Sequence, residues 1–254
     1  MPQDPTERFS DRVQNYIRFR PGYPPPIVPM LISECGLSET SRVADIGSGT
    51  GILTEHFLRL GNRVAAVEPN REMREAAERL WKTEPTFRSV AGRAEATTLA
   101  DRSVDFVTAA QSFHWFDREA ARREFRRILT DDGWVVLLWN ERNPSSSAIA
   151  RAYEELLIRH GTDYLSVDHR RIDEKDLATF FGPGGFQSRS FANSQTLDES
   201  GLRGRVLSAS YMPPPGHPRH EGLLQAVDAL YRRYASHAGV LLEYETKVHF
   251  GHLT

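Results

Sequence analysis

Residues 42–51 read RVADIGSGTG, and this stretch decides the fold that we expect. Its apolar residues predict a buried strand that carries Asp45 near its end. A tight turn follows, in which the missing side chains of Gly47, Gly49 and Gly51 let the backbone approach a ligand closely. An amphipathic helix is expected over residues 50–60. A strand, a glycine turn and a helix N-terminus are typical of a site for a nucleotide-like ligand.

The spacing of these glycines argues against a dinucleotide. A GxGxxG motif needs its third glycine one residue later, where Ile52 stands. The carboxylate of Asp45 would repel a pyrophosphate but suits a cationic amino acid group. A second expected strand, residues 62–67, ends at Glu68, 17 residues after Gly51. An acidic residue at about this separation typically binds ribose hydroxyls.

In these two motifs, the chain resembles the class I S-adenosylmethionine-dependent methyltransferases. VADIGSGTG, from Val43, is similar to the first motif of that family, and VAAVEPN, from Val64, is similar to its second. The resemblance implies S-adenosyl-L-methionine as the cofactor. It also implies a doubly wound, Rossmann-like α/β fold, a seven-stranded sheet with the last strand antiparallel and helices on both faces. Within the family, the chain resembles the methyltransferase type 11 and trans-aconitate methyltransferase branch.

Composition and charge exclude several other classes of protein. The chain has 254 residues and a formal net charge of −2, so no overall basic field favours nucleic acid. Its single cysteine, Cys35, forms no intrachain disulfide, and no apolar run reaches the length of a membrane span. The scattered histidines predict no metal site. We expect a cytoplasmic enzyme, a monomer or homodimer, without a nucleic acid or membrane partner.

The N-terminal residues 1–29 are expected to form an arm outside the core, because prolines end any helix there. In the branch that the chain resembles, a similar run to the one holding Tyr16, Arg20 and Tyr23 closes over the cofactor and the acceptor. The resemblance thus implies a lid. The simpler alternative is an amphipathic arm that packs across the domain.

A second extension, residues 197–238, separates the last two expected strands by more than a hairpin needs. It predicts a helical insertion, with one of its helices over residues 207–218. The resemblance implies that this insertion caps the substrate pocket, with Ser210 and Tyr211 on its inner side. The whole chain, residues 1–254, is expected to be one methyltransferase domain.

The resemblance also implies roles for individual residues toward the cofactor. Asp45 and the glycine turn would hold its amino acid part, Glu68 its ribose, and Met73 its adenine, although Met73 fits a purely structural core position equally well. Arg93 stands where the family carries an acidic residue, so the adenine contacts would come from the backbone of Ala94 and from Glu95. The candidate cofactor residues are Tyr16, Arg20, Asp45, Gly47, Ser48, Gly49, Glu68, Pro69, Met73, Ala94, Glu95 and Gln111.

The run SFHWFD, residues 112–117, follows a buried strand expected over residues 103–111. The carboxyl end of such a strand faces the ligand, so His114 and Trp115 are expected beside the acceptor. The alternative is that Trp115 and Phe116 pack on the next helix and His114 caps it. His114 is the candidate catalytic base, and the candidate substrate contacts are Tyr23, His114, Trp115, Ser210 and Tyr211.

The sequence therefore favours a methyltransferase that acts on a small-molecule acceptor, with a carboxylate as one candidate. A carboxylate oxygen needs no base, and an arginine such as Arg20 would anchor a second carboxylate. A phenol or an amine would need His114. Two alternatives stay open: a cofactor-binding regulatory or partner protein without turnover, and a methyltransferase that acts on a macromolecule.

Overall fold

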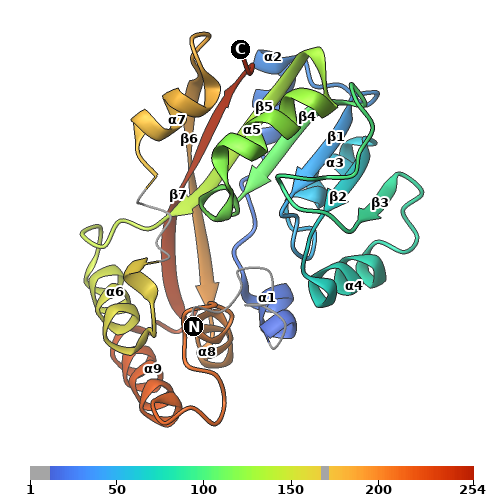
Figure 1. Ribbon diagram of the computed structural model, residues 1–254. Coiled ribbons are helices and arrows are strands. Elements are labelled where there is room, and N and C mark those ends of the chain that lie inside the picture. The colour runs from blue at the N-terminus through green and yellow to red at the C-terminus, as the bar shows by residue number, and fades with distance from the viewer. Residues whose placement is uncertain (1–11, 167–171) are drawn as a thin grey trace.

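One mixed sheet organises the residues that the computed structural model describes, 12–166 and 172–254 (Figure 1). Its strand order is β3-β2-β1-β4-β5-β7-β6. The strands are β1 (Arg42–Ile46), β2 (Arg63–Val67), β3 (Phe87–Val90), β4 (Val104–Ala110), β5 (Leu129–Glu141), β6 (Gln187–Leu197) and β7 (Val240–Gly251). The first five strands are parallel, and β7 is antiparallel to both of its neighbours. This confirms the expected Rossmann-like sheet.

Helices cover the sheet and extend beyond it. They are α1 (Val13–Phe19), α2 (Ile27–Cys35), α3 (Thr54–Leu60), α4 (Arg71–Leu80), α5 (Arg118–Ile128), α6 (Ala148–His160), α7 (Glu174–Phe181), α8 (Glu199–Leu207) and α9 (His220–Tyr234). Short 3₁₀ helices lie at Phe113–Trp115 and Tyr164–Ser166. The helix expected over residues 207–218 is wrong: this segment holds three consecutive prolines, 213–215, which lack the N–H groups that a helix needs. Residues 131–133, which look like a turn in the sequence, belong to β5.

The alternation along the central strands separates two apolar cores. Ala44 and Ile46 of β1 face the core beside α5 and α7, whereas Val43, which precedes Ala44, faces the core beside α2 and α3. All three side chains are at most 1% exposed. A strand buried on both faces is what a parallel sheet covered by helices requires.

A third core lies away from this centre. Figure 1 shows that the β6–β7 hairpin is long and reaches down from the rest of the sheet to α6, α8 and α9. Buried side chains of these helices pack on the far ends of the two strands, among them Tyr153, Leu202 and Leu223. The segment between β6 and β7 therefore forms a helical extension, here called the cap, residues 197–238.

Helix α1 connects the cap to the nucleotide half of the sheet, between α4 and α8 (Figure 1). Val13 packs against Met73 and Ala76 of α4. At the other end, the ring of Phe19 lies so close to α8 that a Cβ on Gly204 would stand 2.1 Å from it. The first 11 residues of the expected arm lie outside the described residues. Within the described ranges, no helix is long and apolar enough to cross a membrane.

Candidate active site

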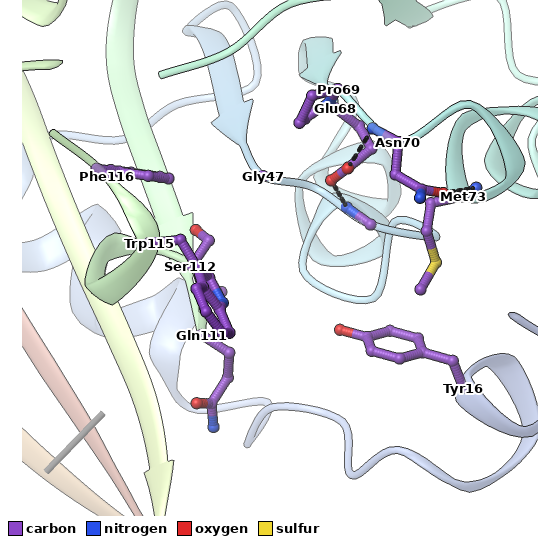
Figure 2. A pocket seen from close by; sticks show the side chains of 12 residues that line it. Tyr16, Gly47, Glu68, Pro69, Asn70, Met73, Gln111, Ser112, Trp115 and Phe116 are labelled. Atoms are coloured by element: carbon purple, nitrogen blue, oxygen red, sulfur yellow. Dashed lines mark hydrogen bonds between the residues drawn. The ribbon is translucent and has the colours of Figure 1, made fainter. Parts of the chain in front are cut away.

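A pocket opens where β1, β2 and β4 end, at the carboxyl edge of the parallel strands (Figure 2). The empty space in it measures about 760 Å³, part of which is open to solvent. This volume lies in the range of small-molecule sites. The lining residues are Tyr16, Gly47, Gly49, Glu68, Pro69, Asn70, Met73, Ala110, Gln111, Ser112, Trp115 and Phe116.

The glycine turn forms the floor of this pocket. The backbone N–H groups of Gly47 and Ser48 donate to the carbonyl oxygen of Val67, at 2.8 and 3.2 Å, which ties the turn to β2. Gly47 has φ +66°, and a Cβ there would stand 2.6 Å from the Cβ of Ser112. The turn therefore needs glycine for its backbone conformation and for its contact with the β4 side of the pocket.

Glu68 stands at the end of β2 and is held by the backbone. Its Oε2 accepts from the N–H of Gly49 at 2.9 Å, and its Oε1 accepts from the N–H of Asn70 at 2.8 Å (Figure 2). Burial raises the pKa of this carboxyl group, and the two backbone hydrogen bonds oppose the rise. Each carboxylate oxygen retains a further lone pair, so the group can also accept from ligand hydroxyls.

Asp45 lies beneath the turn and does not line the pocket. Its side chain is 1% exposed and accepts from the hydroxyls of Thr54, at 2.6 Å, and Thr108, at 3.1 Å. Burial raises its pKa to about 6, and the threonine hydrogen bonds oppose the rise. The carboxylate therefore links β1 to α3 and β4 in this structure.

The start of α4 forms the wall opposite β4. Asn70 caps this helix as expected, because its Oδ1 accepts from the N–H of Met73 at 2.9 Å. Met73 lines the pocket, and its thioether extends toward the ring of Tyr16 (Figure 2). A polarizable apolar side chain at this position suits a flat aromatic ring.

The end of β4 contributes the remaining wall. Gln111 has φ +55°, which turns the chain sharply after the strand. The hydroxyl of Ser112 donates to the carbonyl oxygen of Ile46 at 2.8 Å and so ties this wall to β1. Trp115 and Phe116 line the pocket, whereas His114 does not and lies with its ring centroid 4.8 Å from that of Trp115.

The start of helix α5 shows whether residues 112–117 have the alternative, structural role. Its N-cap is Asp117, whose Oδ1 accepts from the N–H of Ala120 at 3.1 Å, so the expectation that His114 caps the helix is wrong. The expectation that Phe116 packs on the helix is confirmed, because its ring meets Phe125 edge-on at 6.2 Å. Trp115 faces the pocket instead.

The two arm residues expected at the cofactor point to different places. The ring of Tyr16 faces the glycine turn across the pocket, and a Cβ on Gly49 would stand 3.6 Å from its hydroxyl oxygen (Figure 2). The guanidinium of Arg20 lies 5.0 Å from the centre of that ring and donates to the carbonyl oxygen of Ser208 in the cap at 3.0 Å. Tyr23 is buried against α2 and α3 and does not line the pocket.

Several other expected residues also lie outside the lining. Ala94 belongs to the core, and Glu95 accepts from the N–H of Asp117 at 2.9 Å. The hydroxyl of Ser48 is buried and has no hydrogen-bond partner among the described residues. Ser210 and Tyr211 stand in the cap, where the ring of Tyr211 lies 4.8 Å from that of Tyr164.

The sequence identified eight of the lining residues and did not propose Asn70, Ala110, Ser112 and Phe116 as ligand contacts. Each of these four directly follows or precedes a residue that was proposed, so the segment after each strand was the signal that could have identified them. The lining suits the expected cofactor on its own geometry. A carboxylate, a glycine cradle and apolar rings surround one space, and the orphaned Ser48 hydroxyl lies in the same turn.

Comparison with known proteins identifies the family of the chain. A family model described as a methyltransferase domain matches residues 44–137, which include β1, β2 and β4. An uncharacterized methyltransferase-like protein of Schizosaccharomyces pombe is 37% identical over 75% of this chain and 73% of its own length. The malonyl-[acyl-carrier protein] O-methyltransferase of Yersinia pestis is 28% identical over 78% of this chain and 71% of its own length.

Other relatives match over a shorter part. The chain spans about half the length of several curated relatives, such as a second uncharacterized methyltransferase of S. pombe, 36% identical over 54% of each protein. Among solved structures, a protein of Anaeromyxobacter dehalogenans provisionally described as a type II methyltransferase shares the fold. Its TM-score is 0.65 at 20% identity, over 92% of this chain and 98% of that one. The chain therefore belongs to the class I methyltransferase domain family, whose methyl donor is S-adenosylmethionine.

Proposed function

We propose that this chain transfers the methyl group of S-adenosylmethionine to an oxygen of a small carboxylic acid. The observation that carries the proposal is the joining of pocket, arm and cap: Tyr16 lines the pocket, while its neighbour Arg20 binds the cap. An arm and a cap that meet beside the pocket enclose a small acceptor. A macromolecular acceptor would need a more open approach.

The residues that would hold the cofactor follow from the lining. Glu68 would accept the ribose hydroxyls, and Met73 would pack on the adenine. Gly47 and Gly49 would let the amino acid part approach the backbone, with Asp45 acting on its ammonium group from beneath the turn. Ser48 and Gln111 would add polar contacts, and Pro69 would flank the ring. Bound there, the cofactor supplies an electrophilic methyl group.

The protein's contribution to transfer is then orientation and exclusion of water. Trp115 and Phe116 form an apolar wall at the carboxyl end of β4, and Tyr16 faces them across the pocket. Ser210 and Tyr211 would close the acceptor side from the cap. A carboxylate is already ionised near neutral pH, so no proton has to be removed.

Two likenesses support an oxygen acceptor. The sequence resembles the trans-aconitate methyltransferase branch, and the Yersinia pestis relative is by name an O-methyltransferase of malonyl-[acyl-carrier protein]. Both names describe carboxylic acid substrates: trans-aconitate is a small molecule, whereas the malonyl group is attached to a carrier protein. The enclosed pocket of this chain favours the smaller kind.

Calorimetry with purified protein tests the proposal. We expect micromolar binding of S-adenosylmethionine and S-adenosylhomocysteine and no binding of NAD. A screen of small carboxylic acids with S-adenosylmethionine should then yield a methyl ester, detected by mass spectrometry. Binding without turnover across the screen would favour a regulatory protein. Absence of binding would overturn the assignment of the pocket.

Substitution of His114 distinguishes a carboxylate acceptor from a phenol or an amine. For a carboxylate, His114→Ala should lower turnover by less than about tenfold, because the ring then only supports Trp115. A phenol or an amine needs a base, and removal of that base would cost about 10²–10⁴ in rate. Steady-state rates and the pH profile of both proteins measure this, with S-adenosylhomocysteine affinity as the control that should not change.

A further inference from the structure

Three arginines from distant parts of the chain meet at the base of the cap. Arg20 follows α1, Arg142 follows β5, and Arg205 lies on α8. Burial and the charge of Arg205 lower the pKa of Arg20. The charge of Arg142 acts to lower the pKa of Arg205, although neighbouring tyrosines, Tyr244 first, raise that pKa overall. Arg205 therefore lies close enough to Arg20 and to Arg142 for their charges to interact. We call them the arginine cluster.

Each guanidinium in the cluster has a donor without an acceptor. Arg20 donates to the carbonyl oxygen of Ser208, and Arg205 donates to the hydroxyl of Tyr244 at 3.3 Å. Three buried atoms, Nε of Arg20, Nε of Arg142 and Nη1 of Arg205, have no hydrogen-bond partner in the described part of the chain. Arg205 is only 3% exposed. Buried N–H groups of a charged side chain are costly when they remain unpaired.

The described residues place little negative charge around the cluster. Among the described residues, one carboxylate lies within 4.0 Å of a guanidinium group of the cluster. It belongs to Glu154, whose Oε2 lies 3.7 Å from Nη2 of Arg142. Both oxygens of Glu154 already accept from the hydroxyl of Tyr164, at 2.8 and 2.9 Å. Within the described part of the chain, one carboxylate therefore lies beside the cluster, next to Arg142, and that carboxylate has another partner.

Tyrosines complete the surroundings of the cluster. The guanidinium of Arg142 lies 5.2 Å from the ring centre of Tyr153, and its Nη2 lies 3.3 Å from the hydroxyl of Tyr164. Tyr211, whose ring meets that of Tyr164, is the tyrosine that acts most strongly on the charge of Arg142. Aromatic faces hold guanidinium groups in fixed orientations and leave their N–H edges for a ligand.

The cluster lies next to the cofactor pocket. The guanidinium of Arg20 lies 5.0 Å from the ring centre of Tyr16, and Tyr16 also lines the pocket. One aromatic ring thus separates the glycine turn from the first guanidinium. A small acid that spans this ring would have one end at the pocket and the other among the arginines.

We propose that Arg20, Arg142 and Arg205 form an anion site that binds a carboxylate of the acceptor other than the one that is methylated. The inference rests on the proposed function, and it narrows the acceptor to acids with at least two carboxylates. Guanidinium groups bind carboxylates through paired N–H donors, which are the donors left without partners here. The acid would supply both the missing acceptors and the missing negative charge.

An anion site and a purely structural arginine cluster predict different changes in melting temperature when Arg205 is replaced. Repulsion among guanidinium groups that are partly or fully buried destabilises the fold unless a ligand compensates it. Replacing Arg205 by the apolar Met should then maintain or raise the melting temperature of the ligand-free protein. If Arg205 instead stabilises the cap, the same substitution should lower that temperature, and the proposal would be overturned.

Binding of three acids to the protein saturated with S-adenosylhomocysteine gives the direct test. Butanoate, succinate and tricarballylate (propane-1,2,3-tricarboxylate) carry one, two and three carboxylates on similar chains. We expect the affinity to rise by about tenfold or more at the second carboxylate, as hydrogen bonds between charged groups predict. We also expect succinate and tricarballylate to raise the melting temperature.

Variants assign the effect to the cluster. Arg205→Met should abolish the advantage of succinate over butanoate and leave S-adenosylhomocysteine affinity unchanged. Arg203→Gln is the matched control on the same helix, because Arg203 is exposed and pairs with Asp228 at 2.6 Å. It should bind all three acids as the wild type does. Arg142→Met repeats the test from β5 if Arg205→Met does not fold.

The outcomes separate this inference from the proposed function. Equal affinity for the three acids, in a protein that binds S-adenosylhomocysteine, overturns the anion site and leaves the methyltransferase assignment standing. Binding of succinate without binding of S-adenosylhomocysteine would support the anion site and overturn the methyltransferase assignment. An unchanged acid preference in both Arg205→Met and Arg142→Met also overturns the anion site.

Discussion

The cofactor pocket and the arginine cluster differ in how their charges are satisfied. In the pocket, Glu68 accepts two backbone N–H groups and Asp45 beneath it accepts two hydroxyls. In the cluster, Arg20, Arg142 and Arg205 each have a buried donor without an acceptor. The difference teaches that the first region is preorganised by its own chain, whereas the second needs a ligand to complete it.

The largest expected effect comes from a substitution that disrupts the preorganised cofactor pocket. Gly47→Ala should lower the free energy of unfolding by about 2–4 kcal/mol, because the left-handed backbone and the contact with Ser112 add up. Gly36→Ala is the matched control: its φ of +69° is similar, but a Cβ there meets nothing within 4 Å. Urea denaturation of both variants measures the difference. Equal losses would mean that the turn does not press on Ser112.

A pH series sharpens the description of the buried carboxylate. Because the pKa of Asp45 is about 6 in the folded protein and near 3.9 when unfolded, the folded state binds more protons between these values. This group therefore lowers the free energy of unfolding by about 2–3 kcal/mol as pH rises from 4 to 6. Asp45→Asn should remove that fall. Denaturation at several pH values measures it.

Asp105 supplies the control of opposite sign. It pairs with Arg42 at 2.8 Å, which lowers its pKa against the effect of burial. Its contribution to stability is present above its unfolded pKa and is lost as pH falls. Asp105→Asn should thus weaken the loss of stability in acid. If both variants changed the pH profile in the same direction, the assignment of Asp45 would be wrong.

The next effect concerns ligand affinity rather than stability. Glu68→Gln should weaken S-adenosylhomocysteine binding by about tenfold to a hundredfold, because one charged acceptor is lost from a site with two fixed oxygens. Glu78→Gln, on the exposed face of α4, should bind as the wild type does. Calorimetry compares the two. An unchanged dissociation constant for Glu68→Gln would remove Glu68 from the ribose site.

The smallest effect tests the connection between the two regions. Gly222→Ala should stabilise α9 by about 0.5–1 kcal/mol, since its Cβ meets open space. Gly204→Ala offers α8 the same gain, but its Cβ would displace Phe19 of α1. We expect no net stabilisation and faster tryptic cleavage after Arg18. Equal stabilisation of both variants, with unchanged cleavage, would show that α1 does not depend on this contact.

The sequence predicted the local features of the nucleotide half well. The glycine turn, the strand ending at Glu68 and the Asn70 cap are confirmed, since turns, caps and strand ends depend on residues close in the chain. Segment 207–218 was predicted wrongly as a helix, although its prolines carried the opposite signal. The position of Asp45 beneath the turn depends on Thr108, which lies on another strand.

By itself, the sequence determined the family, the sheet and the residues at the end of each central strand, because periodicity and glycine spacing act over short distances. Only the tertiary structure decided which distant side chains share one environment. Arg20 was a candidate from the sequence, but its grouping with Arg142 and Arg205 depends on α1, β5 and α8 converging. Charge repulsion and unpaired donors are properties of that convergence, and no local pattern encodes them.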